Sequence, residues 1–318
     1  MSKILPRLLW WCLCLFPGVL WAQNYPAQLV VASDGSGDYS TIQGAIEKVR
    51  EWSEVPVKII LKPGIYREKV HVPAQKVNIQ LIGENPQNTI VVYNNHVGKG
   101  DITTYSSYTF KVEGHDFYAE GISFVNDAGP VGQAVAMHVD ADRVVFKNCR
   151  FIGNQDTLFV TGDRNRQFFM DCEIEGTTDF IFGSATAVFQ NCTILAKKNS
   201  FITAASTSKD QAYGLVFLDC KINAEPQVSK LFLGRPWRMH AKTVFVRCEL
   251  PAVIHPEGWS VWNQNENHKT AYYAEYASSG PGANSSTRAN WSHQLSSEEV
   301  LRYTLEHIFK DWKSSFSF

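Results

Sequence analysis

The chain has 318 residues, of which 44% are hydrophobic and 19% are charged, with 30 basic and 31 acidic side chains. This composition supports a real hydrophobic core, and the balance of charges excludes the strongly basic character that is typical of nucleic-acid-binding proteins.

The first 22 residues have the features of a secretory signal peptide. Lys3 and Arg7 precede an apolar run that ends near Ala22 and is too short to favour a membrane-spanning helix. Cleavage after Ala22 leaves 28 basic and 31 acidic residues, a formal net charge of −3. No later segment suggests a membrane span, so we predict an exported protein, secreted or periplasmic, with one catalytic domain over residues 23–318.

A strand and a helix are predicted next. Residues 30–32 are β-branched and apolar, and a Gly- and Asp-rich turn follows at 34–38. Ser40 and Gln43 have the spacing of a capping box for a helix over residues 41–52. Because stacked strands leave unpaired backbone at their ends, we expect this helix to cap the amino-terminal end of the strands that follow.

Residues 57–249 contain a repeat. An apolar run that closes on a polar residue and a cysteine occurs five times, at 144–149, 168–172, 188–192, 216–220 and 244–248. The cysteines are 23, 20, 28 and 28 residues apart. A phrase repeated at this period is typical of a solenoid, and the short strand-like runs between turns predict an all-β fold, a parallel β-helix.

The five repeat cysteines allow two interpretations. An odd number at equivalent positions is a poor disulfide framework, so we favour an inward-facing ladder of buried thiols. One or two bridges between adjacent coils remain the alternative, since Cα separations of about 5 Å permit them. The spacing lacks the paired-cysteine pattern of zinc sites, and no metal site is predicted.

Two carboxylates and an amide recur at one interval. Gln133, Asp156 and Asp179 are each 23 residues apart, so on coils stacked about 4.8 Å apart they should form a column. Two acids this close cannot both ionise cheaply, which yields a charged nucleophile and a protonated general acid. Arg235 can pair with Asp179, and the amides of Gln133 and Gln155 can donate to an oxyanion. Taken singly, Asp156 could cap a turn and Arg235 could form a structural corner.

A helix is predicted near the carboxyl terminus. Ser296 and Glu299 can cap it, and Val300, Leu301, Leu305 and Ile308 fall on one face. We expect this helix to pack back on the flank of the solenoid.

Five segments in this order resemble the pectin methylesterase (pectinesterase) family, and the resemblance covers nearly all of residues 23–318. They are 64–68 (GIYRE), 133–137 (QAVAM), 155–157 (QDT), 179–183 (DFIFG) and 233–237 (LGRPW). The resemblance implies a single-stranded right-handed parallel β-helix. A long amino-terminal inhibitor region is not seen before these segments, which we interpret as a bacterial-type member.

The resemblance also implies a demethylation of pectin, or homogalacturonan, that releases methanol. Asp179 is then the nucleophile on the methyl-ester carbonyl, and Asp156 protonates the departing methanol and later activates water. Gln133 and Gln155 are implied to stabilise the oxyanion, and Arg235 to hold Asp179.

The remaining implied contacts are aromatic. Trp237 serves as a sugar platform, and Phe159 and Phe182 line the cleft. Glu68 has no catalytic role in this interpretation. No cofactor is implied, and we expect a monomer whose partner is pectin. Met137 and the loop at 161–164 differ slightly from the common family pattern.

Three other functions stay open from the sequence. A pectate lyase would use calcium and a basic residue, but the chain lacks an obvious acidic cluster and has a different motif set. A binding solenoid without catalysis is opposed by the presence of all five catalytic side chains. A relative acting on small acyl esters or thioesters is disfavoured by the aromatic residues, which suit a sugar polymer.

Overall fold

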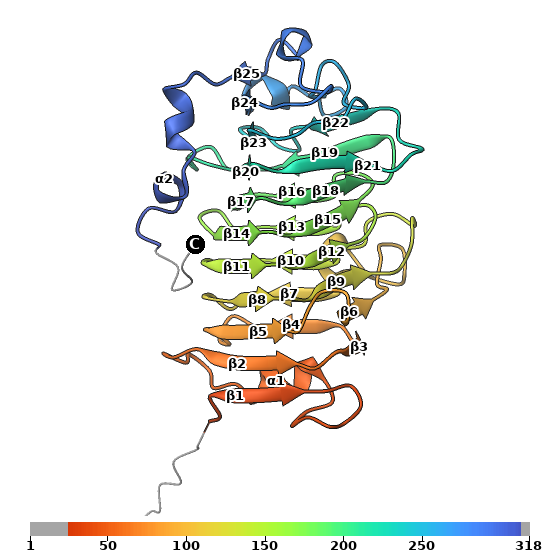
Figure 1. Cartoon of the computed structure of the whole chain (residues 1–318), viewed down its shortest axis with the longest axis vertical. Coiled ribbons are helices and arrows are strands. Elements are labelled where there is room, and N and C mark those ends of the chain that lie inside the picture. The colour runs from red at the N-terminus through yellow and green to blue at the C-terminus, as the bar shows by residue number, and fades with distance from the viewer. Residues whose placement is uncertain (1–24, 313–318) are drawn as a thin grey trace, which may run out of the picture.

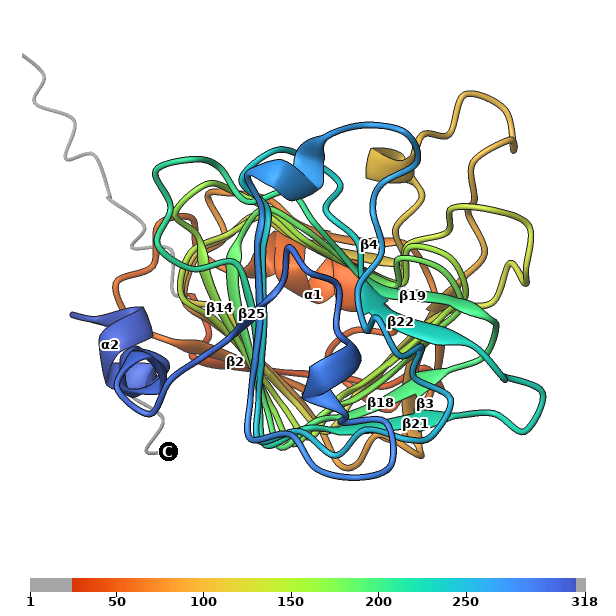
Figure 2. The same cartoon turned by 90° about the horizontal axis from the view of Figure 1, so that it is seen from above.

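The structure, a computed structural model, describes residues 25–312. The chain winds in successive coils whose strands form three parallel sheets stacked along the long axis (Figure 1). We name them sheet A, with 11 strands, and sheets B and C, with 7 strands each. Seen from above, they enclose one core (Figure 2). The predicted all-β fold, a right-handed parallel β-helix, is confirmed. The expected signal peptide lies outside the described residues.

Each sheet is built from strands of neighbouring coils. The strands of sheet A are β1 (Gln28–Val31), β2 (Val57–Leu61), β5 (Ile79–Gly83), β8 (Tyr118–Glu120), β11 (Val144–Lys147), β14 (Arg166–Met170), β17 (Thr186–Gln190), β20 (Leu215–Leu218), β23 (Lys242–Val246), β24 (Tyr272–Tyr276) and β25 (His293–Gln294). The strands of sheet B are β3 (Gly64–Arg67), β6 (Thr89–Tyr93), β9 (Ser123–Asn126), β12 (Arg150–Ile152), β15 (Glu173–Gly176), β18 (Thr193–Ala196) and β21 (Lys221–Ala224). The strands of sheet C are β4 (Val70–Val72), β7 (Phe110–Val112), β10 (Met137–Val139), β13 (Leu158–Val160), β16 (Ile181–Gly183), β19 (Ser200–Ala205) and β22 (Leu231–Gly234).

The helices are short. The α-helices are α1 (Ile42–Lys48) and α2 (Leu305–Phe309), and the 3₁₀ turns are η1 (Thr104–Ser106), η2 (Asn267–Lys269), η3 (Ser285–Thr287) and η4 (Glu299–Arg302). Within residues 25–312, no helix has the length and apolar character needed to cross a membrane.

Helix α1 covers the amino-terminal end of the core, as predicted, with Ile42, Ala45 and Ile46 buried (Figure 1). The predicted cap and end were wrong. The Thr41 hydroxyl, one residue after Ser40, accepts the Gly44 N–H at 3.2 Å, and the helix stops at Lys48.

The Glu68 carboxylate explains why the GIYRE segment is architectural. It accepts the N–H groups of Ile42 and Gln43 at 2.8 and 3.0 Å, so it neutralises free donors at the positive end of α1. The Gln43 amide does not reach back to the helix start but accepts the His71 N–H at 2.8 Å. The prediction that Glu68 has no catalytic role fits this position.

The repeat phrase marks the corner between sheets A and B. The residue before each cysteine has a left-handed backbone, with φ of 47°, 54°, 53°, 55° and 54° at Asn148, Asp171, Asn191, Asp219 and Arg247. Asn and Asp adopt this conformation at lower cost than most side chains, which explains why polar residues recur there.

The five cysteines that follow these corners are buried and unbridged. The inward-facing thiol ladder is therefore confirmed, and the alternative of bridges was wrong. Burial raises the pKa of the Cys149 thiol to about 12, so it packs as a small hydrophobe.

A phenylalanine ladder runs beside the thiols. Phe146, Phe169, Phe189, Phe217 and Phe245 stack with centroid separations of 5.1, 4.8, 4.6 and 4.3 Å. These rings fill the core of successive coils and fix their spacing.

The carboxyl-terminal segment returns along the outside of sheet A (Figure 1). The predicted capping box is present, because the Ser296 N–H donates to Glu299 at 2.8 Å and the Glu299 N–H to Ser296 at 3.1 Å. The single predicted helix was wrong: it breaks after η4, and Thr304 caps a second start at α2. Ile308 is buried on the solenoid, as predicted, whereas Leu301 is 63% exposed.

Candidate active site

Asp156 and Asp179 occupy equivalent places on adjacent coils. Strands β13 and β16 pair with Leu158 opposite Ile181, so the acid two residues before each strand comes into the same register. Both acids have left-handed backbones, with φ of 64° and 49°, and are only 8% and 5% exposed. The predicted juxtaposition of the two carboxylates follows from this 23-residue offset.

Gln133 lies one register position away from its predicted place. It bridges Gln155, not Asp156, because the strand on its coil contains a bulge. The N–H groups of Ala136 and Met137 both donate to the Thr157 carbonyl, at 2.8 and 3.2 Å, which inserts one extra residue. The predicted column of three was therefore wrong, and the structure has a pair of glutamines beside a pair of aspartates.

The two glutamine side chains are available for a ligand. Gln133 and Gln155 line the same pocket as the aspartates, and in the described part of the chain neither amide group has a hydrogen-bond partner. Amide N–H groups in this position can donate to an oxyanion.

Arg235 holds one of the two aspartates. Its Nε and Nη2 donate to the two carboxylate oxygens of Asp179 at 3.1 and 2.7 Å. The guanidinium lies between the rings of Phe201 and Trp262, 4.0 and 4.1 Å from their centres. This sandwich favours one orientation of the planar group and supports the bidentate pair.

The glycine that closes the DFIFG segment keeps the site compact. Gly183 has φ of +132°, and a Cβ on it would lie 1.8 Å from the Val160 carbonyl oxygen of the preceding coil. No larger residue fits there without separating β13 from β16, the strands that position the two acids.

The acids differ in their electrostatic surroundings. Burial raises the pKa of Asp179, but the hydrogen bonds and charge of Arg235 oppose the rise. Asp156 has no such hydrogen bond, so burial and the charge of Asp179 raise its pKa to about 8, against a smaller opposing effect of Arg235. The shared proton therefore belongs on Asp156 at neutral pH, and the charge on Asp179.

One pocket of about 220 Å³ collects these groups. It is lined by Thr104, Tyr105, Gln133, Gln155, Asp156, Phe159, Asp179, Phe182, Ala204, Arg235, Trp237 and Trp262. We name it the catalytic pocket. All eight side chains predicted for the site are among its lining residues.

A family model for Pectinesterase matches residues 28–311. The chain belongs to the pectinesterase family. Pectinesterase 31 of Arabidopsis thaliana is 40% identical over 292 residues, which cover 88% of this chain and 91% of that relative. The chain spans about half the length of the first curated relatives that it matches, 51% and 52% in two of them.

Two solved structures of the family superpose on this pectinesterase-family chain. Pectin methylesterase from carrot has a TM-score of 0.87 at 37% identity, covering 91% of this chain and 96% of that one. Pectin methylesterase PemA from Erwinia chrysanthemi has a TM-score of 0.79 at 28% identity, covering 91% and 98%. The bacterial-type interpretation is unsupported, because the plant relatives are the more similar of these proteins.

Some lining residues of this pectinesterase-family site were not predicted. Tyr105 comes from a long loop, and its ring meets Phe159 edge-on at 5.4 Å. Trp262 follows the last repeat cysteine, where spacing gives no register. The only sequence signal for either was an aromatic residue in a turn-rich segment.

The predicted aromatic residues form one surface of the pocket. Phe159 and Phe182 stack at 4.3 Å with an interplanar angle of 2°, and Trp237 meets Phe182 edge-on at 6.0 Å. His138 stacks under Phe159 at 4.4 Å. Flat apolar faces of this kind suit the faces of sugar rings.

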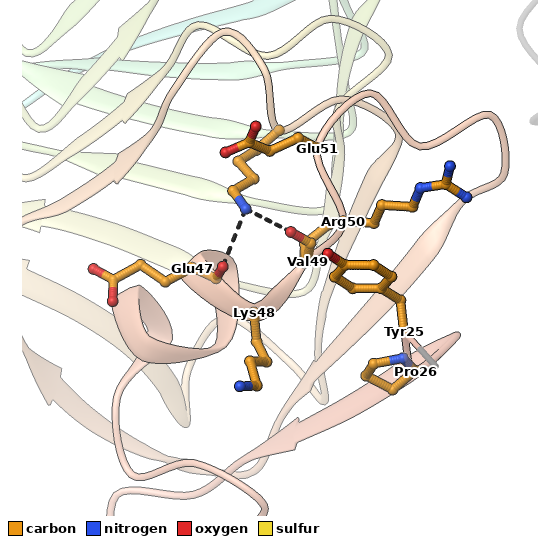
Figure 3. Close-up of a pocket in the computed structure, with 8 residues that line it drawn as sticks. Tyr25, Pro26, Glu47, Lys48, Val49, Arg50 and Glu51 are labelled. Atoms are coloured by element: carbon orange, nitrogen blue, oxygen red, sulfur yellow. Dashed lines mark hydrogen bonds between the residues drawn. The ribbon is translucent and has the colours of Figure 1, made fainter. Parts of the chain in front are cut away.

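A second, larger pocket of about 560 Å³ lies beside α1, at the amino-terminal end (Figure 3). Its polar groups serve the fold. Lys76 Nζ donates to the carbonyls of Glu47 and Val49 at 3.1 and 2.5 Å and so closes the end of α1. This pocket has no carboxylate pair held like that of the catalytic pocket. Among the described residues, no group of three or more His, Cys, Asp or Glu is arranged to hold a metal ion.

Proposed function

We propose that this chain is an ester hydrolase that demethylates methyl-esterified homogalacturonan, the backbone of pectin, and releases methanol and pectate. The observation that carries the proposal is the unequal pair of buried acids, in which Arg235 holds Asp179 while Asp156 has no hydrogen-bond partner among the described residues. Membership in the pectinesterase family supplies the substrate class.

The first half of the reaction forms an acyl-enzyme. The Asp179 carboxylate attacks the ester carbonyl carbon, and the amides of Gln133 and Gln155 donate to the oxyanion that forms. Collapse of this intermediate breaks the bond to the methoxy oxygen. Asp156, protonated at neutral pH, gives its proton to that oxygen, and methanol leaves.

The second half restores both acids. Ionised Asp156 now takes a proton from water as the water attacks the acyl carbonyl, and Asp179 leaves as a carboxylate paired with Arg235. The products are methanol and the free galacturonic acid, and the enzyme returns to its starting protonation. One proton moves out and back through Asp156, so the cycle balances without another proton donor.

The aromatic side chains give the proposed polymer specificity. Trp237, Phe159 and Phe182 line the catalytic pocket and offer apolar faces for sugar rings, as the sequence predicted. We further propose that the protein acts on pectin after export, with residues 23–318 as the mature enzyme.

The proposal is tested by methanol release from highly methylated pectin with residues 23–318, comparing the wild type with Asp179→Ala. Asp219→Ala is a matched control, because Asp219 also has a left-handed backbone and a bidentate arginine, Arg247, but lies outside the pocket. We expect release by the wild type and the control and none by Asp179→Ala. A folded wild type that releases no methanol would overturn the proposal, and an unsaturated product absorbing in the ultraviolet would indicate a lyase.

A further inference from the structure

A second hollow of about 230 Å³ adjoins the catalytic pocket and shares Tyr105, Phe159 and Trp237 with it. Its other lining residues are Thr161, Ser184, Ser206 and Arg238. We name it the flanking pocket. The shared aromatic residues make the two hollows contiguous, so a polymer with one residue in the catalytic pocket can place a neighbouring residue here.

Three hydroxyls form a row along the flanking pocket. Thr161, Ser184 and Ser206 each follow directly after a strand of sheet C, and the strand ends are in register, with Val160 opposite Gly183 and Gly183 opposite Ala205. The row therefore has the spacing of the coils, about 4.8 Å. All three residues are partly exposed, and within residues 25–312 none of their hydroxyls makes a hydrogen bond. These hydroxyls are free to bind a polar ligand.

Arg238 is the one charged side chain among the residues that line the flanking pocket. Its guanidinium lies over the ring of Trp237, 4.7 Å from the centre, and the side chain is exposed. In the described part of the chain it has no carboxylate partner, unlike Arg235, which is fully engaged with Asp179. Stacking on the tryptophan pre-orients the guanidinium and leaves its N–H donors open.

We propose that the flanking pocket binds one unesterified galacturonate residue next to the residue whose ester is being cleaved. Arg238 accepts the carboxylate of that sugar as a charged partner, and the row of hydroxyls hydrogen-bonds its hydroxyl groups. A methyl-esterified residue offers no charge to Arg238, so it binds more weakly there. The inference rests on the proposed function and names a specificity determinant: the enzyme prefers an ester that neighbours a free carboxylate.

The consequence concerns successive turnovers. Each cleavage turns an ester into a carboxylate, which is the group that the flanking pocket recognises. A chain that moves by one residue therefore places the new product against Arg238 and the next ester in the catalytic pocket. Free acids are expected to accumulate next to existing ones.

The test compares two homogalacturonans of equal chain length, one almost fully methylated and one partly de-esterified with alkali. Wild type should show the higher kcat/KM per ester on the second. Arg238→Gln, which keeps length and hydrogen bonding but loses charge, should reduce this preference on the order of tenfold, the effect of losing one charged hydrogen bond. Ser184→Ala should lower kcat/KM on both polymers without changing their ratio. Arg50→Gln, an exposed arginine at the opposite end, is the matched control (Figure 3).

Binding of a pectate oligomer, measured by calorimetry, separates this inference from the proposed function. We expect Arg238→Gln to weaken pectate binding on the order of tenfold, and added salt to weaken wild-type binding more than that of the variant. Equal pectate affinity and an unchanged substrate ratio in Arg238→Gln would overturn the flanking pocket while leaving methanol release intact. If the wild type released no methanol, the proposed function would fail, and the pectate measurement would still decide whether Arg238 binds a uronate.

Discussion

Arg235 donates two hydrogen bonds to Asp179, at 3.1 and 2.7 Å, and none to Asp156 on the neighbouring coil. The difference gives two chemically identical residues separate roles. Charge on Asp179 is stabilised by a fixed guanidinium, whereas charge on Asp156 has only the opposing effects of burial and a negative neighbour. The location of one arginine thus sets which acid attacks and which acid protonates.

Replacing this arginine should move the acid limb of the activity profile. In Arg235→Lys the charge is kept but the bidentate pair is lost, so the pKa of Asp179 should rise further. Ionised Asp179 is needed for attack, and the acid limb of kcat/KM should therefore shift to higher pH. At neutral pH we expect a loss on the order of 10²-fold from the misplaced nucleophile. Arg247→Lys, which alters the analogous Asp219 pair, should leave the profile unchanged.

The basic limb should report Asp156. Burial and the charge of Asp179 raise its pKa to about 8, and the free enzyme must hold this proton to release methanol. We expect kcat/KM to fall as pH rises above about 8, measured by methanol release on uncharged-ester substrate with stability checked at each pH. A kcat/KM that stays level to pH 10 in folded protein would contradict this role for Asp156.

Stability should depend on the same proton. The pKa of Asp156 is raised on folding, so the folded state holds the proton more tightly than the unfolded chain, and stability falls as pH rises from about 4 to about 8. Asp156→Asn removes the titration and keeps the shape. By calorimetry it should melt several degrees above wild type at pH 8, with the gap closing toward pH 4. An equal or lower melting temperature at pH 8 would count against a buried, strained carboxylate here.

The sequence was sufficient for those features that the coil spacing controls. The offset of 23 residues between Asp156 and Asp179 equals the offset of the strands that follow them, so their proximity could be predicted. Gln133 was misplaced because a bulge adds a residue at Ala136 without changing the residue types in the pattern. Spacing records how many residues a coil contains, but not which hydrogen bonds it skips.

Other differences arose where two local patterns compete. Ser40 and Thr41 are both good caps, and the choice of Thr41 depends on Glu68, which is distant in sequence and reaches the same helix start. Near the carboxyl terminus, Thr304 offers a second cap that divides one apolar stripe into η4 and α2. Trp262 sandwiches Arg235 from beyond the repeat, where no periodicity indicated its neighbour.

The phenylalanine ladder should carry a large share of the stability of the central coils. Phe189 is fully buried, with Phe169 at 4.8 Å on one side and Phe217 at 4.6 Å on the other. Phe189→Ala should lower the free energy of unfolding by about 3–5 kcal/mol, because it leaves a cavity that stacked coils cannot close. Phe189→Leu should cost less, since it fills most of the volume.

Chemical denaturation measures this difference, and Phe232→Ala is the control. The Phe232 ring stacks on Phe201 at 5.5 Å but is only partly buried, outside the core. We therefore expect a smaller loss than for Phe189→Ala. In a solenoid each coil contacts chiefly its neighbours, so the damage should centre on β14, β17 and β20, where hydrogen exchange should accelerate most. Equal losses for Phe189→Ala and Phe232→Ala would show that the ladder does not determine the stability of these coils.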